Sequence, residues 1–319
     1  MKRIVLKLGL ICGFVLAIFS GAYPFSELFH GPGLDVLWKL RIPLAVGLAL
    51  SGFSLGGAGV LLQGLFRNPL ADPALFGFSA GASFFALLYV SFLSEFQRSC
   101  SFLTWTLPLV AFLGAIFSMF ILFSLDRLSP IKSPATLLLF GVGWNVFLGA
   151  LSGLILLRLN DSSLHFILWW GFGGSFEKGA GLLLMAGATL LLAIWRVQSE
   201  LKKLDVMVLG ELEASHLGVN LSKLRVRALF SIALLIGISV ALTGPIGFLG
   251  LMMPHIGRMF FGFKHTTLFW VSGLLGSQFL LFSHAFAEQF FYPIELPLGI
   301  IASLLGVPCF FYILRKAQC

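Results

Sequence analysis

The chain has 319 residues, of which 58% are hydrophobic and 11% charged, and its mean hydropathy is +1.00. A soluble domain is about one quarter charged, so this composition excludes a water-soluble globule, and it equally excludes a disordered protein, which would be poor in apolar residues. The net charge of +8 would suit nucleic acid in a soluble protein. In a membrane protein it indicates cationic loops on the cytoplasmic side, so no nucleic-acid partner is expected.

Ten apolar runs predict membrane-spanning helices, each of which needs about 20 residues. A longer run ends near Phe261 and is interrupted by Gly244-Pro245, a pair typical of turns, so it is divided into two spans. The chain is therefore predicted to be an all-α polytopic membrane protein with a single transmembrane domain over residues 1–319. The predicted spans are residues 8–22, 44–64, 75–93, 105–123, 135–157, 179–195, 228–243, 246–261, 267–283 and 297–314.

The first apolar run has a second interpretation, as a secretory signal. Lys2, Arg3 and Lys7 precede it, and it ends on the small residues Ser20-Gly21-Ala22. This is also the pattern of a cleavable signal peptide. In either case we expect the residues after position 22 to emerge on the outer side of the membrane.

Charge distribution predicts the topology. If the N-terminus lies in the cytoplasm and the spans alternate, most of the 21 Lys and Arg residues fall in inner segments, and both termini are cytoplasmic. Every charged residue then lies in a loop or at the end of a span. A charge at mid-membrane costs at least about 2.5 kcal/mol and serves mainly ion or proton transport. No such charge is evident, which argues against an ion-coupled carrier. A secondary transporter stays as the alternative function, favoured only if a buried ionisable residue is essential, and His255 and His284 are the nearby candidates.

The chain has no motif for chemistry of its own. It contains neither GxxxxGK[ST] nor HExxH, and its four cysteines lack CxxC spacing. We therefore expect no metal site, no bound cofactor and no catalytic residue; a membrane enzyme, a second alternative, would need a constellation that the spacing does not reveal. Active transport would require a separate ATPase subunit, which uses the ATP.

The inner segment over residues 196–227 is the one with room for an ATPase to dock. It is polar and holds six basic and four acidic residues. Gly210 and Gly218 bracket about two helical turns within it. We interpret the segment as a short helix, a glycine break and a second helix along the inner surface; the alternative is a solvated connector without a partner.

Eight motifs follow one another from about residue 38 to the C-terminal region. They are LRIP at 40–43, QGLFRNPLADP at 63–73, GFSAGA at 77–82, WGFGGS at 170–175, LGELEASHL at 209–217, GPIGFLGL at 244–251 with Pro254-His255 and Arg258, ELPLG at 295–299, and GVP at 306–308. Together they resemble the FecCD-type permeases, the membrane subunits of bacterial ATP-driven importers for iron–siderophore complexes, haem and vitamin B12.

This resemblance implies the architecture of a type II ABC importer permease, with ten helices per subunit. Two permease subunits, here expected to be a homodimer, would surround a central path in the bacterial cytoplasmic membrane. Two ATPase subunits would bind below, and a periplasmic or lipid-anchored substrate-binding protein would bind above. The implied cargo is a bulky metal chelate: an iron–siderophore complex, haem or cobalamin.

The resemblance also implies roles for individual residues. Asn68 and Leu70 match the cytoplasmic gate, although Pro69 between them would equally suit a turn that merely links two helices. The residues that match the ATPase coupling loop are Leu209, Gly210, Glu211, Ala214, Leu217 and Gly218.

Docking of the binding protein is implied at Arg41 and Glu288. The second of these positions departs from the family, which commonly has Asp and then Arg where this chain has His284 and Glu288. Opposite charges across this interface would set its register. Either the binding protein supplies a Lys or Arg opposite Glu288, or docking relies mainly on Arg41.

Several further residues keep two interpretations. Gln63, Trp144 and Asn145 either face the pathway or hold helices together. His255, alone on an apolar helix, favours a packed core residue over a metal ligand. The glycines of residues 244–248 favour a structural turn.

Overall fold

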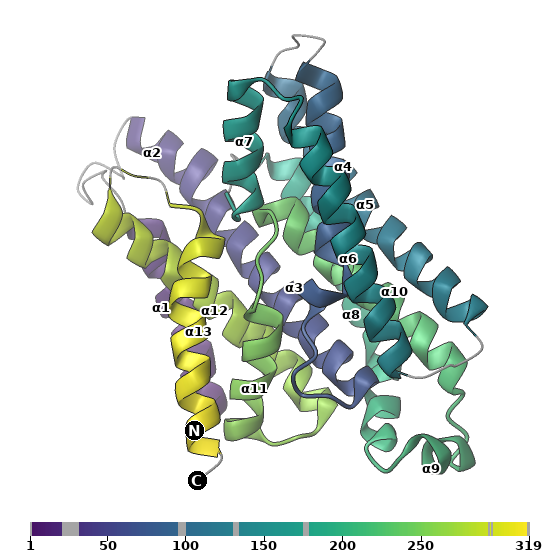
Figure 1. Ribbon diagram of the computed structural model, residues 1–319. Helices are drawn as coiled ribbons and strands as arrows, with labels where there is room; N and C mark the ends of the chain where they lie inside the picture. The colour runs from purple at the N-terminus through teal and green to yellow at the C-terminus, as the bar shows by residue number, and fades with distance from the viewer. Residues whose placement is uncertain are drawn as a thin grey trace.

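The computed structural model describes residues 2–20, 32–94, 100–129, 134–174, 179–292, 294 and 296–317 (Figure 1). All regular elements in these residues are helical. They are α1 (Lys2–Phe19), α2 (Pro32–Val36), the π-helical turn η1 (Leu37–Arg41), α3 (Ile42–Phe66), the 3-10 turn η2 (Pro73–Phe76), α4 (Phe78–Ser94), α5 (Cys100–Leu128), α6 (Pro134–Leu156), α7 (Asp161–Gly171), α8 (Ala180–Met207), α9 (Glu211–His216), α10 (Leu221–Thr243), α11 (Leu249–Phe261), α12 (His265–Phe291) and α13 (Leu298–Ala317).

Each of the ten predicted spans overlaps one of these helices, which confirms the all-α polytopic class. Within the described residues, α3, α5, α6, α8, α10 and α12 contain segments long and apolar enough to cross a membrane. Shorter apolar segments lie in α1, α4 and α13, and α11 has 13 residues. The predicted break is also confirmed, because α10 ends at Thr243 and α11 begins at Leu249.

Helix α3 lies in the middle of the fold and packs against α12, α10, α11 and α8. Residues 51–66 are all buried. Its glycines permit this packing: a Cβ on Gly52 or Gly56 would lie 2.3 or 2.1 Å from carbonyl oxygens of α12, and one on Gly59 would lie 1.8 Å from the Gly250 oxygen on α11. Small residues let membrane helices approach backbone to backbone.

Helix α8 continues well beyond its predicted end at residue 195. The segment from 196 to 207 is helical because no glycine or proline interrupts it, and because Leu201, Leu204 and Met207 are buried in the core. Helix α7 was not predicted; the Asn160 side chain caps it by accepting from Ser163 N at 2.9 Å.

Different helices lie at the two ends of the bundle. Figure 1 places α9, the start of α1 and the end of α13 toward one end, and α7 toward the opposite end. This arrangement positions α9 below the helices that surround α3.

Candidate functional site

The first part of the candidate site is the turn at residues 67–72, which we name the gate turn. It begins where Arg67 adopts a left-handed backbone (φ 49°) and closes the end of α3. Asn68 then orders the turn: its Oδ1 accepts from Leu70 N at 2.9 Å, and its carbonyl accepts from Ala71 N at 3.1 Å. The side chain of Leu70 is left 51% exposed at the tip of the turn.

Gln63 supports the gate turn from inside the protein and is only 4% exposed. Its Nε2 donates to the carbonyl oxygens of Ala71 (3.4 Å) and Leu251 (3.2 Å), and its Oε1 accepts from Arg258 Nη2. One side chain therefore joins α3, the gate turn and α11. Of the two interpretations, helix linkage is the one that these contacts support.

Trp144 and Asn145 on α6 also make contacts between elements. Trp144 Nε1 donates to Ser118 Oγ on α5 at 3.0 Å, and Asn145 Nδ2 donates to the Ala74 carbonyl of η2 at 3.4 Å. Both side chains hold α6 against the rest of the chain.

Asp72 ends the gate turn and connects it to α11. Its Oδ1 accepts from Ala74 N at 3.1 Å, which caps η2, and its carboxylate also accepts from the backbone N–H of Phe248. Burial raises the pKa of Asp72, and the two N–H groups partly oppose that shift. Phe248 has φ 71°, so the residue before α11 is held in a left-handed backbone next to this carboxylate.

The second part of the candidate site is the coupling segment, residues 208–220. The predicted short helix between glycines is confirmed as α9, flanked by Gly210 (φ 134°) and Gly218 (φ 85°). The expected neighbours of α9 were wrong in one respect. The helix before it is the end of α8, and the helix after it is α10, which begins at Leu221 and continues into the buried core instead of lying along the surface.

The coupling segment has a buried side and an exposed side. Ala214 is fully buried, and Arg225 on α10 binds Glu211 with Nη2 3.1 and 3.3 Å from its two carboxylate oxygens. These contacts hold α9 against α10. Leu209, Leu212 and Leu217 are exposed, Leu212 by 73%.

The predicted coupling-loop residues did not include two members of this exposed side, Val208 and Leu212. Their signal was an apolar side chain in an otherwise polar segment. The predicted set also included Ala214, which points inward and packs within the core.

A hydrogen-bonded pair, Asp205 and His265, connects the end of α8, which leads into the coupling segment, to the helices around the gate turn. Asp205, in the last turn of α8, accepts from both the backbone N (2.6 Å) and Nδ1 (2.9 Å) of His265, the first residue of α12. A Cβ on Gly64 would lie 2.7 Å from His265 Nε2, so α3 contacts this pair one residue after Gln63. His265 had no place in the sequence interpretation.

The docking candidates lie at the other end of the molecule. Arg41 Nη1 donates to the Ile18 carbonyl of α1 at 2.8 Å, and Glu288 attracts the Arg41 guanidinium electrostatically. The structure therefore brings Arg41 and Glu288 together. Nearby in sequence, Lys39 and Asp35 form an exposed ion pair with an N···O distance of 2.8 Å.

His255 is not a satisfied core histidine. Its two ring nitrogens are buried and have no hydrogen-bond partner in the described part of the chain, and its ring packs edge-on against Phe310 with centroids 5.6 Å apart. Across those residues no group of three or more His, Cys, Asp or Glu side chains is arranged to hold a metal ion.

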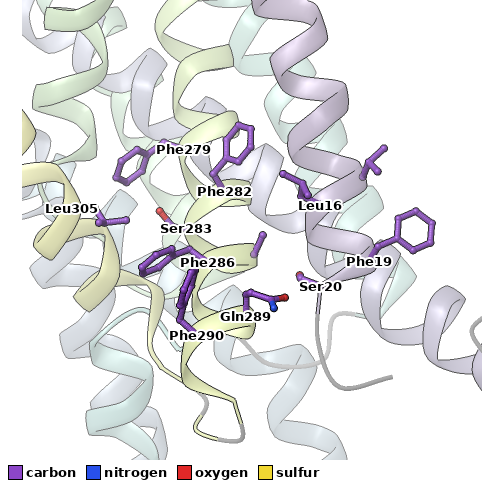
Figure 2. A pocket seen from close by; sticks show the side chains of 12 residues that line it. Leu16, Phe19, Ser20, Phe279, Phe282, Ser283, Phe286, Gln289, Phe290 and Leu305 are labelled. Atoms are coloured by element: carbon purple, nitrogen blue, oxygen red, sulfur yellow. The ribbon is translucent and has the colours of Figure 1, made fainter. Parts of the chain in front are cut away.

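A pocket of about 520 Å³ lies between α1, α12 and α13 (Figure 2). Its lining is aromatic. The ring centroids of Phe286 and Phe290 lie 4.6 Å apart, and Figure 2 shows Phe279 and Phe282 on the same helix. Its polar groups are Ser20, Ser283 and Gln289. Such a lining suits an apolar group, and the pocket shares no residue with the gate turn or the coupling segment.

Comparison with known proteins identifies what this arrangement is similar to. The sequence profile described as the FecCD transport family matches residues 8–316. The chain is 32% identical over 325 residues to the hemin transport system permease protein HmuU of Yersinia pestis, covering 99% of this chain and 96% of that protein. It is 32% identical over 320 residues to the vitamin B12 import system permease protein BtuC of Serratia proteamaculans, covering 99% and 92%.

The fold is similar to a solved structure as well. A chain assigned to the metal-chelate type of ABC transporter, in an inward-facing conformation, matches with a TM-score of 0.85 and 27% identity over 98% of both chains. Two residues of the matching motifs, Ser175 and Glu295, lie outside the described residues.

Proposed function

Because the chain belongs to the FecCD transport family, we propose that it is the membrane-spanning permease subunit of an ATP-driven importer for a bulky metal chelate. The match along nearly the whole length to permeases named for hemin, iron(3+)-hydroxamate and vitamin B12 carries this proposal. The cargo is a chelate of that class: haem, an iron–siderophore complex or cobalamin. The protein acts in the bacterial cytoplasmic membrane with both termini on the cytoplasmic side, and residues 1–319 act as one permease domain.

The energy comes from two ATPase subunits that bind the coupling segment, and this chain binds no cofactor. The exposed leucines of the coupling segment support this assignment, because three large apolar side chains on a short cytoplasmic helix and its flanks favour contact with a partner. Glu211 and Ala214 hold the segment to α10, so a force on the leucines is passed to the helices.

Motion reaches the gate turn through α8 and α12. The Asp205–His265 pair joins the end of α8 to the start of α12, and α3 contacts His265 at Gly64. Gln63, adjacent to Gly64, binds the gate turn at Ala71. Displacement of the coupling segment is therefore transmitted to Asn68 and Leu70, which open or close the cytoplasmic end of the path. ATP and the binding protein favour different states by their different contacts in each.

The second permease subunit is another copy of this chain and packs on α6. In this helix Gly149 and Gly153 form a GxxxG pattern, and a Cβ on either would meet nothing within 4 Å. Leu139, Val146 and Leu154 on the same helix are exposed. An open GxxxG face is the kind of surface that membrane helices use for close association.

The substrate-binding protein docks at the opposite end, where Arg41 and Glu288 lie. The two side chains offer a positive and a negative group that attract each other, so the partner presents a carboxylate and a cation in matching positions. Such pairing sets the orientation of docking and speeds the encounter.

The decisive experiment is uptake by the reconstituted complex. Vesicles containing this chain, its ATPase and its binding protein are expected to accumulate haem, a ferric hydroxamate or vitamin B12 only when ATP is supplied. Accumulation by this chain alone, driven by a proton gradient and abolished by replacing His255 and His284, would instead establish the secondary transporter.

The role of the coupling segment has its own test. Leu212→Asp combined with Leu217→Asp is expected to abolish capture of the ATPase by this chain, because both replacements put charge into an apolar contact. Leu128→Asp, at an exposed leucine that ends α5, is the matched control and should leave capture unchanged. Equal capture by all three proteins would contradict the proposed interface.

A further inference from the structure

A polar pocket of about 750 Å³ opens between α8 and α10, one to three turns before α8 ends. Four of its lining side chains are cations, Arg196, Lys202, Lys203 and Arg227, and one is a carboxylate, Glu200. The lining therefore has a net positive charge. None of these residues belongs to the gate turn, the coupling segment or the docking pair.

Two residues that line this pocket, Glu200 and Arg196, each have a buried polar side-chain atom without a partner in the described ranges. Glu200 is only 2% exposed; its Oε1 accepts from Ser199 Oγ at 3.0 Å, but its buried Oε2 has no hydrogen-bond partner in the described ranges. Arg196 Nε is likewise buried and unpartnered, while its guanidinium lies 5.0 Å from the centroid of the Phe230 ring. Buried polar groups are normally satisfied, so the pocket is suited to a ligand with both acceptor and donor atoms.

The membrane lies beside this pocket. Leu184, Leu191, Trp195 and Lys202 are spaced by seven, four and seven residues, so they share one exposed face of α8. From Leu184 to Trp195 the helix rises about 16 Å, roughly half of the hydrocarbon thickness of about 30 Å, which is one leaflet. Trp195 is 74% exposed, and tryptophan concentrates at the boundary between hydrocarbon and headgroups.

Along this face of α8 the side chains are apolar over the length of one leaflet, then comes Trp195, and then the cations. This order matches the acyl chains, the interface and the phosphate of a phospholipid. We propose that the pocket binds an anionic phospholipid whose headgroup also carries hydroxyl donors, as phosphatidylglycerol does. The phosphate lies among Arg196, Lys202, Lys203 and Arg227, a headgroup hydroxyl donates to Glu200 Oε2, and the acyl chains follow the exposed leucines of α8. Basic pockets between membrane helices recognise headgroups in this way.

The pocket lies on the half of α8 that leads to α9, so the leaflet is the cytoplasmic one under the topology proposed above. Only that choice of leaflet depends on the proposed function. Lipid binding is measured without ATP, an ATPase or cargo, so its failure and a failure of transport are distinguishable.

The test measures lipid retained by the full-length purified protein in native mass spectra, after exchange from vesicles of phosphatidylglycerol in phosphatidylcholine. Wild-type protein is expected to retain phosphatidylglycerol in preference to phosphatidylcholine. Lys202→Gln combined with Arg227→Gln is expected to lower that retention about fivefold for each cation removed. Both side chains are exposed, so we expect the double variant to keep its fold. An unchanged melting temperature checks this.

Lys223→Gln is the matched control, because Lys223 is an exposed cation on α10 that does not line the pocket. It is expected to retain lipid as the wild type does. Equal losses in Lys223→Gln and in the double variant would overturn the proposal. Displacement of the bound species by inorganic phosphate at equal concentration would identify a site for free phosphate, and cross-linking of Lys202 to the ATPase would identify a protein interface; either result overturns the lipid assignment.

Discussion

Helices α3 and α6 are both long, apolar and glycine-containing, but they occupy opposite environments. The most apolar stretch of the helix that includes α3 is 78% buried within the chain, whereas that of α6 is 11% buried. Gly52, Gly56 and Gly59 of α3 lie against the backbone of α12 or α11, while Gly149 and Gly153 of α6 face open space. The same residue type therefore permits close packing inside the subunit in one helix and leaves an exposed surface in the other, where we propose that a second copy packs.

The polar residues of the two helices differ in the same way. Gln63 on α3 contacts a turn and another helix and accepts from a charged arginine, whereas Asn145 on α6 makes one long hydrogen bond to η2. The buried amide of Gln63 is thus bound inside the subunit through both its nitrogen and its oxygen. Four substitutions test this difference between α3 and α6, and they are described in order of decreasing expected effect.

The largest effect is expected at Gly59. Gly59→Val places a side chain where a Cβ would already lie 1.8 Å from the Gly250 carbonyl oxygen, so α3 and α11 must separate. We expect a loss of about 3 kcal/mol in stability, measured as a fall in melting temperature in detergent. Gly143→Val on α6 is the control, since nothing lies within 4 Å of that position. An equal fall in both variants would remove the distinction between the helices.

A smaller loss is expected when Gln63 is replaced. Gln63→Leu keeps the volume but leaves Arg258 without its acceptor, at a cost of about 2 kcal/mol. A double-mutant cycle with Arg258→Leu measures the coupling, because the two losses should not add when the residues act as a pair. Additive losses would show that the contact between the two side chains contributes nothing.

Gly153→Ile tests the opposite property, assembly without a change in the fold. The isoleucine blocks close approach of a second α6. We expect the dissociation constant of the dimer to rise about tenfold, which corresponds to a loss of about 1.4 kcal/mol in association free energy. Light scattering over a dilution series measures the dimer, and the melting temperature of the monomer should be unchanged. Gly187→Ile, at an open glycine of α8, is the control. A dimer as strong as wild type would place the interface on another helix.

The smallest effect is expected at Asn145. Asn145→Ala removes a single hydrogen bond of 3.4 Å to the Ala74 carbonyl, so stability should fall by no more than about 1 kcal/mol. A loss as large as that of Gln63→Leu, measured by the same thermal unfolding, would mean that α6 is as firmly built into the subunit as α3.

Much of the candidate site could be located from the sequence because its signals are local. Gly210 and Gly218 mark the ends of α9 since both adopt positive φ, and Pro69 follows Asn68 in a turn whose hydrogen bonds span two or three residues. Gly244-Pro245 likewise separates α10 from α11. Such features depend on backbone geometry over a few residues, which the amino-acid types themselves restrict.

Other features had no local signal. The Asp205–His265 pair joins residues 60 positions apart, and the contact of Gln63 with Arg258 joins residues 195 apart. The extension of α8 to Met207 depends on burial of Leu201 and Leu204 by other helices, so hydropathy alone ended the helix too early. Arg41 bonds to a carbonyl of α1, a partner that its own motif does not indicate.

The amino-acid sequence by itself determined that this protein is an all-helical membrane protein, where its helices break and which turns carry glycine or proline, because transfer of apolar residues to lipid and the restrictions on φ act residue by residue. The packing of the helices determines which of two equally apolar helices, α3 or α6, is buried and which is exposed. That outcome depends on close contact between backbones far apart in the chain, and a glycine has the same chemistry whether another helix lies against it or not.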